Sequence, residues 1–212
     1  MATVNLSTFD FVHDIQSIYR HLLDAMARPG KIVNIKHACR KTAPPSSFSK
    51  TMAGLAFTLL DTEVHFFVDA DEPLSAVEFL RKNTYSHFTS VDRADFLFID
   101  RLLQTREIEE LMRRVKKGTL QNPHQSATIF ISVDELGKGR GIRYVLKGPG
   151  IRSENELFVV GLDRKWISER KRVNDEYPMG VDIVLVTPQG DLVALPRTTS
   201  LKEGEDEWDT LP

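Results

Sequence analysis

The chain has 212 residues, which allows one large α/β domain or two small ones and a sizeable buried core. Its 28 Lys and Arg residues nearly balance 30 Asp and Glu residues, so strong global attraction to nucleic acid or to an anionic membrane is not expected. The single cysteine, Cys39, excludes an internal disulfide and suits a reducing compartment. The N-terminus carries no basic stretch followed by an apolar core, so we expect no signal peptide and a cytoplasmic protein.

The first hundred residues alternate helices and strands. Apolar residues recur every three or four positions over residues 11–26, which predicts a helix that Pro29-Gly30 ends. In chain order, the next predicted elements are a strand at 31–35, a loop at 41–47, an apolar helix at 48–60, a strand at 63–68, a helix at 74–82 that begins at Pro73, and a strand at 96–99.

The remaining residues carry more consecutive strands. The predicted elements are a helix at 106–117, strands at 127–133 and 141–147, a polar helix at 164–174, and a hairpin with strands at 181–187 and 192–195. We therefore expect one α/β domain over residues 1–200, built as a three-layer α/β/α sandwich with a mixed sheet. Residues 201–212 are acidic and are expected to form a loose tail.

The sequence contains no strong motif for a metal or a cofactor. The six histidines form no HxH, HxxxH or HExxH pair, so we expect no metal site. The GKGRG run at residues 137–141 leads into a strand rather than a helix, which favours a hairpin turn over a phosphate-binding loop. Cys39 lies beside two cations that favour reactivity, although a lone cysteine is more often a packed residue. We expect neither a metal nor a cofactor.

The C-terminal hairpin holds a carboxylate inside an apolar run, at Asp182. A buried carboxylate is costly unless it is paired, and the returning strand brings Arg197 toward the start of the first strand. We expect a structural ion pair between Asp182 and Arg197, with a ligand site as the alternative.

Three blocks of sequence resemble one known family. They are YRHLLDAMARPG at residues 19–30, LKGPGI at residues 146–151, and YPMGVD at residues 177–182 followed by LPRTT at residues 195–199. In order, spacing and total length they are similar to the H-subunit family of the bacterial carbon–phosphorus lyase core complex (phosphonate metabolism PhnH family). The region 36–47 and the acidic tail match no motif of that family.

The resemblance implies a fold similar to the large domain of pyridoxal-phosphate-dependent transferases, without the cofactor and its lysine. It implies a homodimer that joins G, I and J subunits and has no independent activity. With the ATP-binding L subunit, the G, H and I subunits support replacement of the adenine of ATP by a phosphonate, which gives an α-D-ribose 1-phosphonate 5-triphosphate. The J subunit, an iron–sulfur radical enzyme, later breaks the carbon–phosphorus bond. The resemblance provides no catalytic residue to assign in this chain.

Three hypotheses follow for this chain. The first is a supporting subunit of the phosphonate-processing complex. The second is a subunit that itself contacts the triphosphate or phosphonate through arginines, because guanidinium groups bind phosphoryl oxygens in bidentate fashion; the candidates are Arg20, Arg28, Arg152 and Arg197. The third is a nucleic-acid-binding module that uses the basic clusters near Arg113 and Lys171, which the near-neutral charge disfavours. The sequence does not identify the phosphonate or the surface that meets each partner.

Overall fold

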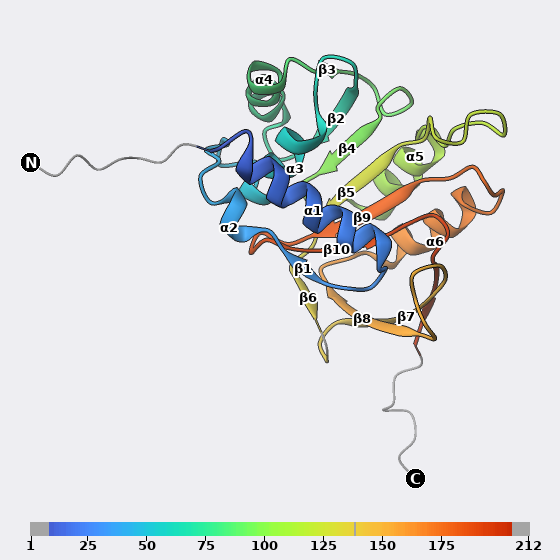
Figure 1. Ribbon diagram of the computed structural model, residues 1–212. Coiled ribbons are helices and arrows are strands. Elements are labelled where there is room, and N and C mark those ends of the chain that lie inside the picture. The colour runs from blue at the N-terminus through green and yellow to red at the C-terminus, as the bar shows by residue number, and fades with distance from the viewer. Residues whose placement is uncertain (1–8, 138, 205–212) are drawn as a thin grey trace, which may run out of the picture.

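The computed structural model describes residues 9–137 and 139–204, and its centre is a mixed seven-stranded sheet (Figure 1). The strand order is β1 (Val33–Asn34), β10 (Asp191–Leu195), β9 (Asp182–Val186), β5 (Thr128–Ser132), β4 (Phe96–Ile99), β2 (His65–Asp69) and β3 (His87–Phe88). Neighbouring strands from β9 to β3 run parallel, whereas β10 is antiparallel to both β9 and β1. The predicted C-terminal hairpin is thus the antiparallel part of the sheet.

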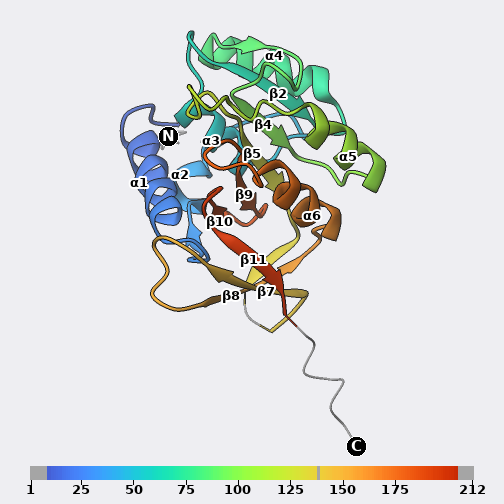
Figure 2. The ribbon, with the colours of Figure 1, turned by 90° about the vertical axis from the view of Figure 1, so that its right-hand side faces the viewer.

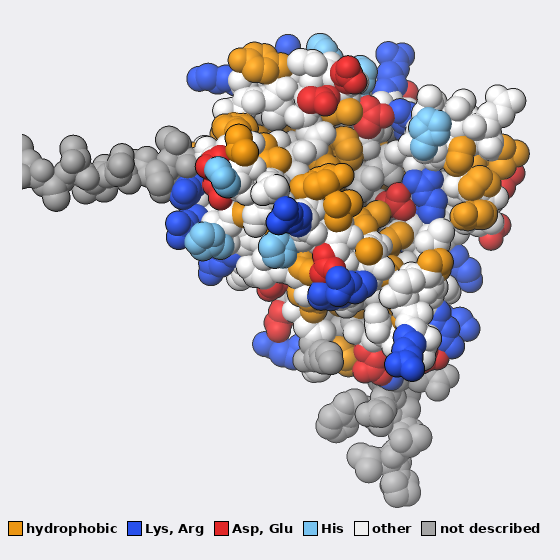
Figure 3. All heavy atoms as spheres, in the orientation of Figure 1, with side chains coloured by type: hydrophobic (Ala, Val, Ile, Leu, Met, Phe, Trp, Pro, Cys, Tyr) orange, Lys and Arg blue, Asp and Glu red, His pale blue; other side chains and the backbone are white. Residues whose placement is uncertain are grey.

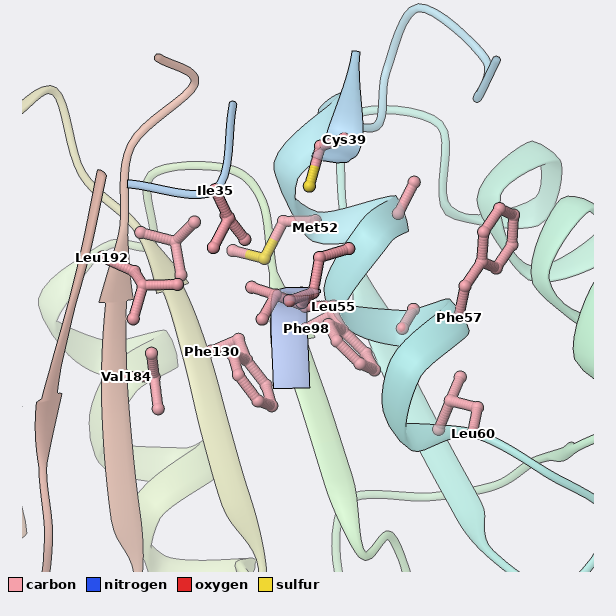
Figure 4. Close-up of a cluster of buried hydrophobic side chains, with 14 of the residues drawn as sticks. Ile35, Cys39, Met52, Leu55, Phe57, Leu60, Phe98, Phe130, Val184 and Leu192 are labelled. Atoms are coloured by element: carbon pink, nitrogen blue, oxygen red, sulfur yellow. The ribbon is translucent and has the colours of Figure 1, made fainter. Parts of the chain in front are cut away.

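Four helices cover one face of this sheet: α1 (His13–Ala27), α2 (Lys36–Cys39), α3 (Lys50–Leu59) and α4 (Pro73–Thr84). Helix α3 is apolar on nearly all sides because it lies against the sheet, and the Ser49 side chain caps it by accepting a hydrogen bond from the Met52 amide at 3.2 Å. Figure 4 shows its side chains packed over Phe98 and Phe130. These two rings stack with centroids 5.1 Å apart, so one apolar core joins β4, β5 and the helical layer.

The opposite face is covered by two helices and a second sheet. The helices are α5 (Thr105–Arg114) and α6 (Arg164–Val173), and the four-stranded antiparallel sheet has the order β11 (Ser200–Glu203), β7 (Ile142–Lys147), β8 (Asn155–Val160) and β6 (Glu135–Gly137). Alternate residues of the central strands point to the two faces, so Leu97 and Ile99 pack into this second core whereas Phe98 packs into the first.

The expected α/β class and mixed sheet are confirmed, but the second layer was not anticipated in full. The predicted sandwich has helices alone on both faces, whereas a second sheet covers part of one face here. Strands β3, β6, β8 and β11 and helix α2 were not predicted. The loose tail expected from residue 201 is wrong for residues up to Glu203, because these form β11 and pair with β7. The rest of that predicted tail, residues 205–212, lies outside the described residues.

The glycine-rich run at residues 137–141 is not the turn of a hairpin. It leads from β6 to β7, and these two strands lie on opposite sides of β8 rather than side by side. Across residues 9–137 and 139–204, no helix is long and apolar enough to cross a membrane.

Candidate functional site

The three sequence blocks of the family resemblance meet at one place in the fold. The loop after β7 contacts the end of α1 so closely that a Cβ atom added to Gly150 would lie 2.2 Å from the carbonyl oxygen of Ala27. The same loop reaches the third block, where a Cβ atom added to Gly148 would lie 2.8 Å from the carbonyl oxygen of Thr198. Both glycines have positive φ angles, +82° at Gly150 and +146° at Gly148. The glycines therefore permit the close backbone packing that joins α1, the second sheet and the segment after β10.

Arg197 and Asp182 form a largely buried ion pair. The Arg197 Nη2 lies 2.8 Å from Asp182 Oδ2, and the Arg197 backbone amide donates to Asp182 Oδ1 at 2.7 Å. The guanidinium also donates to the carbonyl of Pro123 at 2.9 Å and to the hydroxyl of Ser126 at 2.5 Å. The side chains are only 17% and 14% exposed, so this network joins the start of β9 to the segment after β10 and to the loop before β5.

The other three candidate arginines lie apart from this network. Arg20 is exposed on α1, and Arg152 is exposed in the loop after β7. Arg28 is exposed at the end of α1 and forms an ion pair with Asp24 one turn earlier. Of the four arginines, only Arg197 lines the groove described next.

A groove of about 710 Å³ runs between α6 and the segment 197–203. Figure 2 shows β11 beside α6 on this side of the molecule. Besides apolar and hydroxyl side chains, its lining includes six cations and three carboxylates: Arg164, Lys165, Arg170, Lys171, Arg197 and Lys202, with Asp163, Asp175 and Glu203. Three of these cations are already in ion pairs, Arg164 with Glu203, Lys165 with Glu109 and Arg197 with Asp182. Arg170 and Lys171 form no ion pair with any of the described residues.

Arg170 lies at the base of α6 and is buried, with only 4% of its surface exposed. Its Nη2 donates to the backbone carbonyls of Leu195 at 3.3 Å, Pro196 at 2.5 Å and Thr199 at 3.0 Å. Burial lowers the pKa of this guanidinium to about 10. The sequence places Arg170 in a run of cations that is typical of a solvated helix face, so its burial went unrecognised.

Three buried polar atoms of residues that line the groove have no hydrogen-bond partner among the described residues. They are the Arg170 Nε, the Thr199 Oγ1 and the Tyr144 hydroxyl oxygen. Burial, followed by the nearby Glu203 carboxylate, raises the pKa of Tyr144 to about 12, so this phenol is a hydrogen-bond donor at neutral pH. Neither Tyr144 nor Thr199 carries a motif, and the only sequence signal was the LPRTT block that ends at Thr199.

The basic clusters expected for a nucleic-acid module are largely ion-paired. The pairs are Arg113–Glu110 at 2.6 Å, Lys165–Glu109 at 2.6 Å and Arg172–Glu169 at 2.7 Å. These carboxylates lower the positive potential that phosphate binding along a helix face requires.

Cys39 is a packed residue, as the lone-cysteine argument favours. Its side chain lies against α3, so that a Cβ atom added to Gly54 would meet the Cys39 Sγ at 2.4 Å. Burial raises the pKa of the thiol to about 12, which keeps it protonated and unreactive. In the part of the chain that the structure describes, no three His, Cys, Asp or Glu side chains are grouped so as to hold a metal ion.

Comparison with known proteins places these features in one family. Residues 7–202 match a family model described as bacterial phosphonate metabolism protein (PhnH). The C-P lyase subunit protein HtxG of Stutzerimonas stutzeri is 31% identical over 188 residues, which cover 88% of this chain and 85% of that protein. The alpha-D-ribose 1-methylphosphonate 5-triphosphate synthase subunit PhnH of Rhizobium meliloti (strain 1021) is 28% identical over 195 residues, which cover 91% of this chain and 92% of that one. The matched region begins before α1 and ends within β11, so the chain belongs to the PhnH family of bacterial phosphonate metabolism proteins.

Proposed function

We propose that this protein is a subunit of a carbon–phosphorus lyase core complex. In that complex it supports transfer of the ribose 5-triphosphate of ATP from adenine to a phosphonate. The observation that carries this proposal is the near full-length correspondence with the Rhizobium meliloti synthase subunit, which covers 91% of this chain and 92% of that one. Because the match covers nearly the whole of both chains, the two proteins correspond over the same folded unit, which supports the same role for this chain.

The proposed partners are a second copy of this chain and the G, I and J subunits, in the cytoplasm. Helix α1 offers a surface that fits such an assembly, because Val12, Tyr19 and Leu23 are spaced seven and four residues apart and lie on one side of the helix. Their exposures are 71%, 48% and 49%, and Figure 3 shows hydrophobic side chains along this helix. Apolar residues exposed in a row are typical of protein–protein contacts.

The proposal also includes a fold similar to the large domain of pyridoxal-phosphate-dependent transferases, without the cofactor. The mixed seven-stranded sheet with helices on both faces supports this comparison. Such a likeness describes architecture, and it assigns no transferase chemistry to any lysine of this chain.

Affinity purification tests the proposed assembly. The tagged chain is isolated from phosphate-starved source cells, and its partners are identified by mass spectrometry. We expect the G, I and J subunits in stoichiometric amounts, and loss of growth on methylphosphonate as sole phosphorus source when the gene is deleted. Recovery of the chain alone, together with normal growth of the deletion strain, contradicts the proposal.

A second candidate function is direct contact with the anionic substrate or product of the complex. The groove beside α6 favours it, because the buried Arg170 belongs to its wall and has no carboxylate of the described residues within ion-pair distance. Binding of ATP or methylphosphonate to the purified chain is the measurement that separates this candidate from a purely supporting role.

A further inference from the structure

We propose that the groove between α6 and β11 is a binding site for a ligand that bears phosphoryl or phosphonyl groups. Its buried donors are the Arg170 Nε, the Thr199 hydroxyl and the Tyr144 hydroxyl. This inference rests on the second candidate function and deepens it, because it names the site and the residues that would contact the anion.

The first argument is the unpaired charge of Arg170. Arg170 is only 4% exposed as a residue, and no carboxylate of the described residues lies within ion-pair distance of its guanidinium. The more distant Asp182 carboxylate, which is paired with Arg197, offsets only part of the effect of burial. Three backbone carbonyls fix the Nη2 edge and leave the Nε unpartnered. A buried charge is costly unless an opposite charge accompanies it. An ordered water would supply an acceptor for the Nε but no negative charge, whereas an anion supplies both.

The second argument is that the residues bearing the three unpartnered atoms all line one groove. Buried polar atoms of folded proteins nearly always have a hydrogen-bond partner, so each exception calls for an explanation. Thr199 is 2% exposed and Tyr144 is 1% exposed, and their hydroxyls come from different elements, the segment before β11 and the strand β7. The residues that bear these atoms come from two unrelated segments and α6, and all three belong to the lining of one groove.

The third argument concerns the chemical class of the ligand. The Arg170 Nε can only donate, and the Tyr144 phenol, which is protonated at neutral pH, can donate as well. Phosphoryl and phosphonyl oxygens are acceptors that carry negative charge, and the exposed Lys171 stands on the rim to meet further oxygens. A volume of about 710 Å³ lies in the range of nucleotide-sized ligands and exceeds what a single phosphate requires. A ribose polyphosphate or nucleotide therefore fits the groove better than a free phosphonate.

The test uses variants that remove only the unpartnered atoms. Tyr144→Phe and Thr199→Val delete hydroxyls that make no hydrogen bond among the described residues, so we expect unchanged or higher thermal stability. Removal of Arg170 would leave three carbonyls unsatisfied and could prevent folding, so it is not the primary variant. Tyr85→Phe is the matched control, because it deletes a phenol that is 73% exposed and outside the groove.

Isothermal titration calorimetry of the full chain is carried out with ATP, inorganic phosphate, methylphosphonate and, as the probe without phosphoryl groups, adenosine. We expect ATP to bind, adenosine not to bind, and the affinity to fall with added salt. Tyr144→Phe and Thr199→Val should each weaken ATP binding roughly tenfold, and Tyr85→Phe should leave it unchanged. Displacement of ATP by methylphosphonate at lower concentration than by phosphate would assign the anion subsite to the phosphonate; the reverse order would assign it to a phosphate of the nucleotide.

The site is overturned if none of the three anions binds, or if both groove variants bind ATP as tightly as the unaltered chain. Copurification of the same variants with the G, I and J subunits is measured in parallel. If ligand binding fails but copurification is intact, the proposed ligand site is wrong and the proposed assembly stands. If the ligand binds but no partner subunits copurify, the proposed assembly is wrong and the ligand site stands.

Discussion

Two arginines with little exposure, Arg197 and Arg170, illustrate different uses of the same side chain. Arg197 has a carboxylate partner and donates to Pro123 and Ser126, so its charge and its donors are satisfied within the fold. Arg170 has carbonyl partners only, all of them on its Nη2, and its buried Nε has no partner among the described residues. The first arginine is therefore suited to holding strands together, and the second to holding an anion.

Arg197→Ala should lower the free energy of unfolding by about 3–5 kcal/mol, because it leaves the buried Asp182 carboxylate without its cation. Urea denaturation measures the effect. Arg113→Ala is the matched control: Arg113 pairs with Glu110 on the surface, where its side chain is 67% exposed, and its loss should cost at most about 1 kcal/mol. Unchanged stability of Arg197→Ala together with lost activity of the complex would instead favour a ligand role for Arg197.

Asp10 should contribute an acid-dependent part of the stability. Backbone hydrogen bonds from His13 and then from Val12 lower the pKa of its carboxyl from 3.8 to about 2. Because the folded pKa is the lower one, this contribution is present above pH 4 and is lost as the pH falls from about 4 to about 2. The melting temperature of the unaltered chain should drop more steeply over that interval than that of Asp10→Asn. Parallel pH profiles for the two proteins would contradict the assignment.

At the level of elements, the local sequence pattern is sufficient to predict a helix or strand that has strong periodicity or clear end signals. The strand at residues 96–99 and the helix α6 were predicted almost to the residue. Strand β11 was missed because Ser200–Glu203 is short and polar, and only its pairing with β7, far away in the sequence, makes it a strand. The burial of Arg170 was missed for the same reason, since the carbonyls that surround it come from the segment 195–199. Long-range pairing and packing of this kind leave no periodic signal in the sequence.

The junction of α1 with the loop after β7 should be intolerant of any side chain at Gly150. Gly150→Ala would place a Cβ atom 2.2 Å from the Ala27 carbonyl oxygen at a residue whose φ is +82°. We therefore expect the free energy of unfolding to fall by at least about 3 kcal/mol. Gly139→Ala is the control for backbone strain alone, because Gly139 has a φ of +92° and no atom of the described residues within 4 Å of an added Cβ. Gly139→Ala should lower the free energy of unfolding by about 1–2 kcal/mol. If the two variants lose the same free energy of unfolding in chemical denaturation, the contact with α1 does not contribute to stability.

At the scale of the whole molecule, the exposed apolar face of α1 gives the proposed assembly a testable surface. Leu23→Lys should change the stability of the isolated chain by less than about 0.5 kcal/mol, because Leu23 is already 49% exposed. It should nevertheless reduce recovery of a second copy or of partner subunits in the affinity purification. Leu74→Lys on α4, where the leucine is 77% exposed, is the control for an added surface charge. Full recovery with Leu23→Lys would place the contact elsewhere.

The placement of β11 has a consequence for the order in which the molecule is made. All seven strands of the main sheet precede residue 196 in the chain, whereas one wall of the groove is the last described strand. Synthesis proceeds from the N-terminus, so the main sheet is available for folding on the ribosome before this wall emerges. A chain terminated at residue 198 retains every strand of the main sheet but lacks both the Thr199 hydroxyl and β11. Ligand capture in the groove would therefore distinguish completed chains from truncated ones that have already formed the main sheet.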